Sequence, residues 1–125
     1  MINAIAKAIY DELSTVVTAY HVIAPQTAAL PYVTFGLSTD IPVGTFASPS
    51  AIEDTTWWVN AFSKTGSKDA GAQAALVMGA LDNVALPIVG GYTAMKCVRE
   101  FIGSPIYDPE TGVYQIPMRY RIWVD

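Results

Sequence analysis

Charged side chains are scarce in this chain of 125 residues. Only 14% are Asp, Glu, Lys or Arg, whereas 52% are hydrophobic; an ordinary soluble domain carries about 25% charged residues. So apolar a composition excludes a disordered chain, because disorder requires low hydrophobicity and high net charge. Area scaling gives about 6,500 Å² for the folded chain against about 19,000 Å² unfolded, so roughly two-thirds of the surface can be buried. We therefore expect a single domain over residues 1–125.

Cysteine and clustered basic residues are also lacking. The single cysteine, Cys97, excludes an internal disulfide and a zinc site built from cysteines, and it fits a reducing compartment. The net charge of −4 and the scattered basic residues argue against binding to a nucleic-acid backbone. Prolines and glycines interrupt each apolar stretch before the ~20 residues that a membrane helix needs. Because the first residues also lack a signal-peptide pattern, we expect folding in the cytoplasm without a membrane.

The spacing of apolar residues predicts the elements of the first half of the chain. Apolar residues recur every three or four positions from Ile2 to Tyr20, which predicts an amphipathic helix. Two prolines indicate a loop over residues 24–31, and the β-branched and aromatic residues of 32–38 predict a strand. Residues 39–52 combine prolines and a glycine with apolar side chains, which indicates a long apolar loop or hairpin of a kind that is often functional.

A second strand and a second helix follow. The strand predicted over residues 53–64 places Trp57 on one face and Trp58 on the other, so we expect both faces to be covered. An alanine-rich helix is predicted to begin with Ser67 as its cap and to end near Asn83.

Two further strands are predicted at the end of the chain. Residues 92–107 indicate a long strand that can break at 103–105. Residues 108–112 carry the Asp-Pro-Glu-Thr-Gly pattern of a turn. Residues 114–124 alternate between an apolar face and a polar face that bears two arginines. The order of elements predicts an α+β, two-layer domain: a mainly antiparallel or mixed sheet of about four strands, both helices on one face, and a long loop or hairpin after the first strand.

Candidates for chemistry are few, and we predict no catalytic, cofactor-binding or metal-binding residue. His21, the only histidine, lies where the first predicted helix ends, which favours an interaction with the helix terminus. Cys97 lies in a predicted strand and favours a small buried apolar role. A Cys–His pair remains an open alternative. The phosphate-binding glycine spacings are absent.

The tryptophans and two arginines favour packing or contact with another molecule. Trp57 and Trp58 point to opposite faces of a strand, so they do not form one stacking platform. Arg119 and Arg121 share one face of the last strand, where they fit either an anion or an ion pair between subunits.

The sequence resembles the tail-completion or tail-terminator proteins of long-tailed bacteriophages, including minor tail proteins of lambda-like phages. The resemblance spans nearly the whole chain. Besides the first helix, the passages that carry it are residues 24–33, where a strand starts after a proline; residues 58–64, which lead into the alanine-rich helix; residues 107–114, with the turn Asp-Pro-Glu-Thr-Gly; and residues 118–124, Met-Arg-Tyr-Arg-Ile-Trp-Val.

The resemblance implies a structural virion protein rather than an enzyme. Its subunits would form a ring, expected to be hexameric, at the head-proximal end of the tail after assembly in the host cytoplasm. The ring would contact the tail tube protein and the head-completion proteins, need no cofactor, and let genomic DNA pass without specific binding. A ring buries two different lateral patches on each copy, which fits the low charge. We expect the contact residues to be Ile41, Val43, Phe46, Trp57, Trp58, Arg119, Arg121 and Trp123.

Three alternatives stay open from the sequence. In the same structural class, the chain could be a neck or head-completion protein, or a subunit of the tail tube. In a different class, it could be a small enzyme or ligand-binding α+β domain that uses His21, Cys97 and the tryptophans.

Overall fold

The chain forms a strongly curved sheet that wraps around two helices. A computed structural model describes residues 2–44, 52–88, 90 and 96–124. The sheet has seven strands in the order β1-β2-β3-β7-β5-β4, with β6 also paired to β7. Only β1 and β2 run parallel; the other neighbours are antiparallel. The elements are α1 (Ile2–Leu13), β1 (Ala19–His21), β2 (Tyr32–Val43), β3 (Ile52–Ser63), α2 (Ser67–Leu81), β4 (Val84–Ala85), β5 (Lys96–Ile102), β6 (Ile106–Asp108) and β7 (Val113–Val124).

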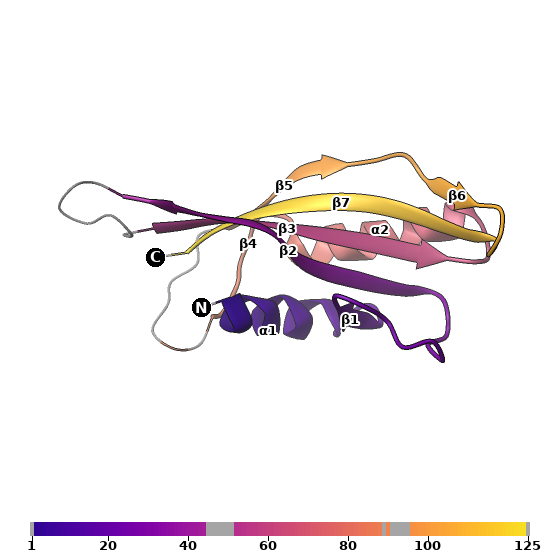
Figure 1. The fold of residues 1–125 in the computed structure, drawn as a ribbon, viewed down its shortest axis with the longest axis horizontal. Helices are drawn as coiled ribbons and strands as arrows, with labels where there is room; N and C mark the ends of the chain where they lie inside the picture. Colours follow the sequence, from indigo (N-terminus) through magenta and orange to yellow (C-terminus); the bar gives the residue numbers. More distant parts are fainter. Residues whose placement is uncertain (1, 45–51, 89, 91–95, 125) are drawn as a thin grey trace.

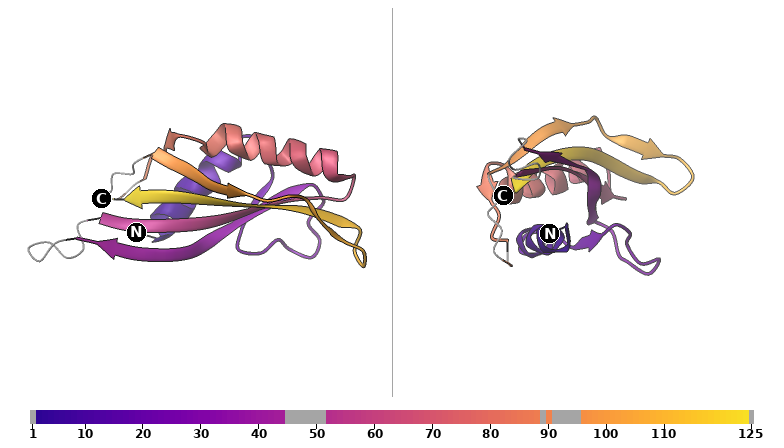
Figure 2. Two further views of the ribbon diagram at one scale, coloured as in Figure 1. Left: turned by 90° about the horizontal axis from the view of Figure 1, so that it is seen from above. Right: turned by 60° about the vertical axis from the view of Figure 1, so that its left-hand side comes forward.

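Both helices lie on the concave side of the sheet, as Figures 1 and 2 show. Helix α2 packs on β3, β7 and β5, and α1 packs on α2 and β1. The apolar stripe of each helix and the inward residues of the central strands form one continuous core. The largest fully buried side chains are Trp57, Tyr120, Phe35, Ile5, Ile9, Leu13, Leu81, Met118, Ile122, Val33, Val59 and Val77.

The α+β class and the placement of both helices on one side are confirmed, but the sheet has more strands than the four or so predicted. The unpredicted strands β1 and β4 are two or three residues long, too short to leave a periodic pattern, and β6 is the short piece beyond the predicted break at 103–105. The first helix also ends at Leu13 instead of reaching Tyr20. The chain turns there, and Ala19–His21 pairs with β2 as a parallel strand.

The segment predicted as a long apolar loop begins as strand. β2 continues to Val43, and its ladder with β3 reaches the pair Val43 and Ile52. The register shifts between Leu37 and Thr39, and β2 continues to pair with β3 beyond this irregularity. Ile41 and Val43 therefore lie in a strand, whereas Phe46 lies outside the described residues.

The predictions for the second half are largely confirmed. Helix α2 begins at Ser67, but Gly66 occupies the cap position and no side chain caps the helix, so the predicted capping role of Ser67 is wrong. The strand predicted over residues 92–107 is present from Lys96 with its break at 103–105, and residues 92–95 lie outside the described residues. In the turn after β6, the Oδ1 atom of Asp108 accepts a hydrogen bond from the amide of Glu110, and Gly112 takes a positive φ of 70°. These features fit the turn chemistry of the sequence.

Candidate interaction surface on the convex face of the sheet

The convex face of the sheet carries large apolar and aromatic side chains that the described part of the chain leaves exposed or only half-buried. In the register of the strands, the even-numbered residues of β3 point to this face together with their partners on β2 and β7. The exposed fraction of Trp123 is 40% and that of Phe101 is 46%. We define the convex face by Tyr32, Ile41, Val43, Asp54, Trp58, Phe62, Val98, Phe101, Arg119, Arg121 and Trp123.

One half of the convex face is built around Trp58. The indole lies against the backbone of Gly36, its partner on β2, and a Cβ atom added to Gly36 would collide with the ring. On the other side, Trp58 pairs with Arg119 of β7, whose guanidinium carbon lies 5.7 Å from the centre of the Phe101 ring. Among the described residues, Arg119 forms no ion pair. This guanidinium is therefore available to a partner.

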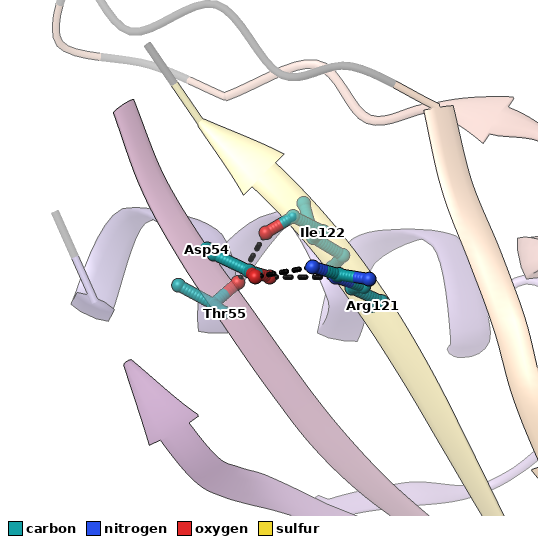
Figure 3. Close-up of polar contacts among 4 residues, drawn as sticks. All are labelled: Asp54, Thr55, Arg121 and Ile122. Atoms are coloured by element: carbon teal, nitrogen blue, oxygen red, sulfur yellow. Dashed lines mark hydrogen bonds and ion pairs between the residues drawn. The ribbon is translucent and has the colours of Figure 1, made fainter. Parts of the chain in front are cut away.

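The other half is built around Arg121, which joins β7 to β3 (Figure 3). Its Nε and Nη2 atoms donate hydrogen bonds of 2.8 and 2.5 Å to the two carboxylate oxygens of Asp54. Its guanidinium carbon also lies 4.9 Å from the ring centre of Trp123. The hydrogen bond from Arg121 holds the pKa of Asp54 below its usual value, although partial burial opposes the shift. The two-point contact with Asp54 fixes the orientation of the guanidinium over the Trp123 ring.

A hollow of about 300 Å³ lies beside this ion pair, lined by Lys96, Val98, Arg121 and Trp123. The lining is mainly apolar and includes two cationic side chains, Lys96 and Arg121. Such a hollow fits an apolar side chain of a partner, with carboxylates at the rim.

Of the residues predicted to make contacts, Ile41, Val43, Trp58, Arg119, Arg121 and Trp123 share the convex face. Trp57 does not, and its predicted contact role is wrong. Its ring is fully buried on the concave side, and its Nε1 atom donates a 3.0 Å hydrogen bond to Oγ1 of Thr55. Thr55 in turn donates to the carbonyl of Ile122, as Figure 3 shows. We expected both faces of β3 to be covered. Within the described part of the chain, the helices cover only the concave face.

Sequence reasoning missed the contribution of β5 to the convex face. Val98 and Phe101 lie beside Arg121 and Arg119 in the ladder. The pairing of β5 with β7 brings these two residues onto the convex face. The residue pattern of a single strand does not reveal which strand will pair with it. The irregular register between Arg99 and Phe101 also hides the alternation.

His21 and Cys97 do not form a pair. His21 lies in β1, exposed and stacked on Phe35 at 5.1 Å between ring centres, so its predicted place at a helix end is wrong. Cys97 lies in β5, and three strands (β2, β3 and β7) separate the two in the sheet order. Burial, and secondarily the charge of Asp82, raise the pKa of the Cys97 thiol to about 12, which opposes formation of the reactive thiolate.

The described residues also hold no cluster of His, Cys, Asp or Glu suited to a metal ion. Within the same part of the chain, no helix has the length and apolar character needed to cross a membrane.

Comparison with known proteins agrees with the sequence resemblance. Residues 4–125 match the family described as tail completion protein gp17. No curated protein matches the chain. Among solved structures, a chain from the virion of a native gene transfer agent particle superposes with a TM-score of 0.75 at 16% identity, covering 98% of this chain and 95% of that one. A second solved chain superposes with a TM-score of 0.69 at 17% identity, covering 98% and 94%. At these identities the superpositions show a shared fold, and the family match shows that this chain belongs to the tail completion protein gp17 family.

Proposed function

We propose that the chain is a structural subunit that forms a ring, expected to be hexameric, on the head-proximal end of a tail tube. The ring stops growth of the tube and presents a surface to the head-completion proteins. The observation that carries this proposal is the convex face: the described part of the chain leaves Phe101 and Trp123 exposed and Trp58 only half-buried. Membership of a tail completion protein family supports the tail as the place where partners cover this face.

The area of the chain supports assembly. The described fold exposes 7,020 Å², and two lateral contacts of about 800 Å² each would bury roughly a quarter of that area. Charged residues are depleted at the core of such contacts, while aromatic residues and arginine are enriched. The convex face has this composition, with Arg119 and Arg121 among its few charges. Assembly therefore explains the low charge of the sequence without a membrane.

The proposal includes no cofactor and no catalytic step. Within the described residues the thiol is buried and the histidine lies far from it in the sheet. The net charge of −4 fits a ring through which DNA passes without being held. The partners are further copies of the chain, the tail tube protein and the head-completion proteins.

Genetic complementation tests the proposed function. Particles produced without the protein should carry overlong tails or tails without heads, and the wild-type gene should restore normal particles. Trp123→Ser should fail to restore them while the purified variant keeps its circular dichroism spectrum. Leu76→Ser is a matched control, because Leu76 is similarly exposed, at 43%, but lies on α2. Normal infectious particles without the protein would refute the proposal.

Immunogold labelling tests the position. A single band of label at the head–tail joint is expected. Label along the whole tail would identify a tube subunit instead, and label on heads that lack tails would identify a head-completion protein.

A further inference from the structure

Two stretches of sheet edge are open in the described part of the chain. β1 pairs with β2 only opposite Val33, Thr34 and Phe35, which leaves residues 37–43 of β2 unpaired on that side. β4 pairs with β5 only at Lys96 and Cys97, which leaves residues 98–102 unpaired. Open edges with apolar side chains are sites for pairing with another strand.

The outward backbone groups of β2 follow from its bonds. Val33 donates its amide hydrogen to the carbonyl of Thr18, so its backbone groups face the β1 side of the strand, the side that is open from residue 37 onward. Residues of β2 whose backbone groups point away from β3 pair with odd-numbered residues of β3, as Val33 does with Ala61. Beyond the register shift, Asp40 pairs with Thr55 and belongs with these residues. The backbone groups of Asp40 therefore point outward.

The outward backbone groups of β5 also follow from its hydrogen bonds. The carbonyl of Cys97 accepts a hydrogen bond from Asn83, so its backbone faces away from β7, and Arg99, two residues on, does the same. After the irregularity, the amide of Gly103 donates inward to Pro117, so the backbone of Ile102 points outward. Arg99 and Ile102 are separated by three positions, and so are the outward residues Leu37 and Asp40 of β2. The irregularities in β5 and β2 therefore leave the same spacing between outward-facing backbone groups.

Strand direction also fits. Three successive antiparallel steps, from β2 to β3, β7 and β5, make β2 and β5 antiparallel to each other. Copies related by rotation about an axis along the strands would bring β5 of one against β2 of the next in antiparallel orientation. Because the two edges are different surfaces, the contact is head-to-tail and can close into a ring.

We propose that residues 37–41 of one copy pair with residues 98–102 of the next as an antiparallel ladder, with Asp40 opposite Arg99 and Ile41 opposite Val98. This inference rests on the proposed ring and specifies how its subunits touch. It makes the sheet continuous from copy to copy and leaves the middle of the convex face for the tail tube or the head-completion proteins.

The side chains at the junction are complementary. The Oδ1 atom of Asp40 is buried and has no hydrogen-bond partner among the described residues. The Arg99 guanidinium contacts Asp82, at 3.5 Å, and the sulfur of Met78, which leaves donors for a second carboxylate. On the convex side, Ile41 is 55% exposed and Val98 is 48% exposed. Pairing would thus give the Asp40 carboxylate a hydrogen-bond donor and would cover the side chains of Ile41 and Val98.

The ladder ends at Pro42, because Cys97, the residue that would lie opposite, is already paired with β4. The carbonyl of Cys97 accepts a bond from Asn83. Proline has no amide hydrogen to donate, so the missing acceptor has no consequence.

Disulfide trapping tests the register. Ile41→Cys and Val98→Cys are combined in a Cys97→Ala background and supplied to particles that lack the protein. Opposite residues of a non-hydrogen-bonded antiparallel pair lie about 4.5 Å apart between Cα atoms, within disulfide range. Mild oxidation should give a ladder of reducible bands that ends at the copy number of the ring. The control pair Val43→Cys and Val98→Cys is two residues out of register and should cross-link at least tenfold less.

The outcomes separate the two proposals. Particles that contain the protein but cross-link no more than the control would overturn the edge pairing alone. Particles produced without the protein that show no tail defect, or complemented particles that never incorporate it, would refute the ring function. If the double variant does not assemble, purified Ile41→Cys and Val98→Cys chains are mixed at high concentration. A disulfide-linked dimer in the mixture, absent from either protein alone, supports the pairing, and its absence overturns it.

Discussion

The two faces of β3 differ in what covers them, although both carry a tryptophan. Trp57 is fully buried under the helices and donates a hydrogen bond to Thr55, which also bonds to β7. Its neighbour Trp58 lies on the convex face against Gly36 and beside Arg119. The same residue type thus serves folding on one face and remains available for contact on the other.

The hydrophobic side chains of this chain therefore fall into two sets, one buried in the core and one on the convex face. The concave face fills one core that includes the polar bridge from Tyr120 to Asp82, a 2.7 Å hydrogen bond at the end of α2. The convex face replaces such a core with ordered arginines stacked on aromatic rings. A monomer folds with the first set, and we infer that an assembly covers the second.

The largest expected effect is the loss of the concave tryptophan. Trp57→Ala should lower the free energy of unfolding by about 3–5 kcal/mol, because it removes a fully buried ring from a packed core. Trp123→Ala on the convex face should change it by less than about 1 kcal/mol while reducing the yield of complete particles. Urea unfolding followed by circular dichroism measures the first quantity, and electron microscopy of particles measures the second. Equal destabilisation by the two variants would erase the distinction between the faces.

A smaller effect is expected for the hydroxyl that supports Trp57. Thr55→Val leaves the Trp57 Nε1–H without its acceptor and should lower the free energy of unfolding by about 1–2 kcal/mol. Thr56→Val is the matched control, because Thr56 lies next in sequence but on the convex face, opposite Arg121. Urea unfolding of both variants should separate them, and similar values would argue against the Thr55 bridge.

The ion pair on the convex face predicts a pH dependence. The pKa of Asp54 is lowered in the folded chain by Arg121, so its contribution to stability is present above the unfolded pKa of 3.8 and is lost as the pH falls through the folded pKa. Asp54→Asn should therefore be less stable than the wild type at neutral pH, with the difference vanishing in acid. Thermal unfolding between pH 2 and 7 (roughly the range in which carboxylates titrate) checks this. A difference that persists at the acid end would contradict the ion-pair origin.

The smallest effect is expected at the adjacent carboxylate, with the opposite sign. Hydrogen bonding and repulsion from Asp40 raise the pKa of Glu53 above 4.5, with burial acting in the same direction. Its ionisation therefore opposes folding as the pH rises through the window between 4.5 and the folded pKa. Glu53→Gln should be more stable than the wild type above that window and equal to it below. A variant less stable than the wild type at neutral pH would contradict the repulsion.

Much of the fold follows from local patterns. The alternation of β7 predicts its buried face, and the turn at Asp108 is specified by its own residues. The opposite orientation of Trp57 and Trp58 also follows from strand geometry. Which of the two is buried does not, because both faces of the strand are aromatic and the helices that decide the matter are distant in sequence.

Long-range pairing accounts for the rest. Asp54 and Arg121 are separated by 67 positions and meet only because β3 and β7 are neighbours. The extension of β2 through Pro42 was hidden, because a proline inside a run argues against a central strand and nothing in the run shows that it lies at an open edge. Val98 and Phe101 were missed for the same reason: a contact surface on a sheet belongs to several strands at once.

The contact role of the convex face is tested most directly by oxidative footprinting of the tryptophans in free chains and in assembled particles. We predict that Trp58 and Trp123 react with hydroxyl radicals in the free chain and are protected at least several-fold in particles. Tyr10, exposed on α1, serves as the reference within the same molecule. Equal reactivity of both tryptophans before and after assembly would show that the convex face stays open and would contradict the proposed contact surface.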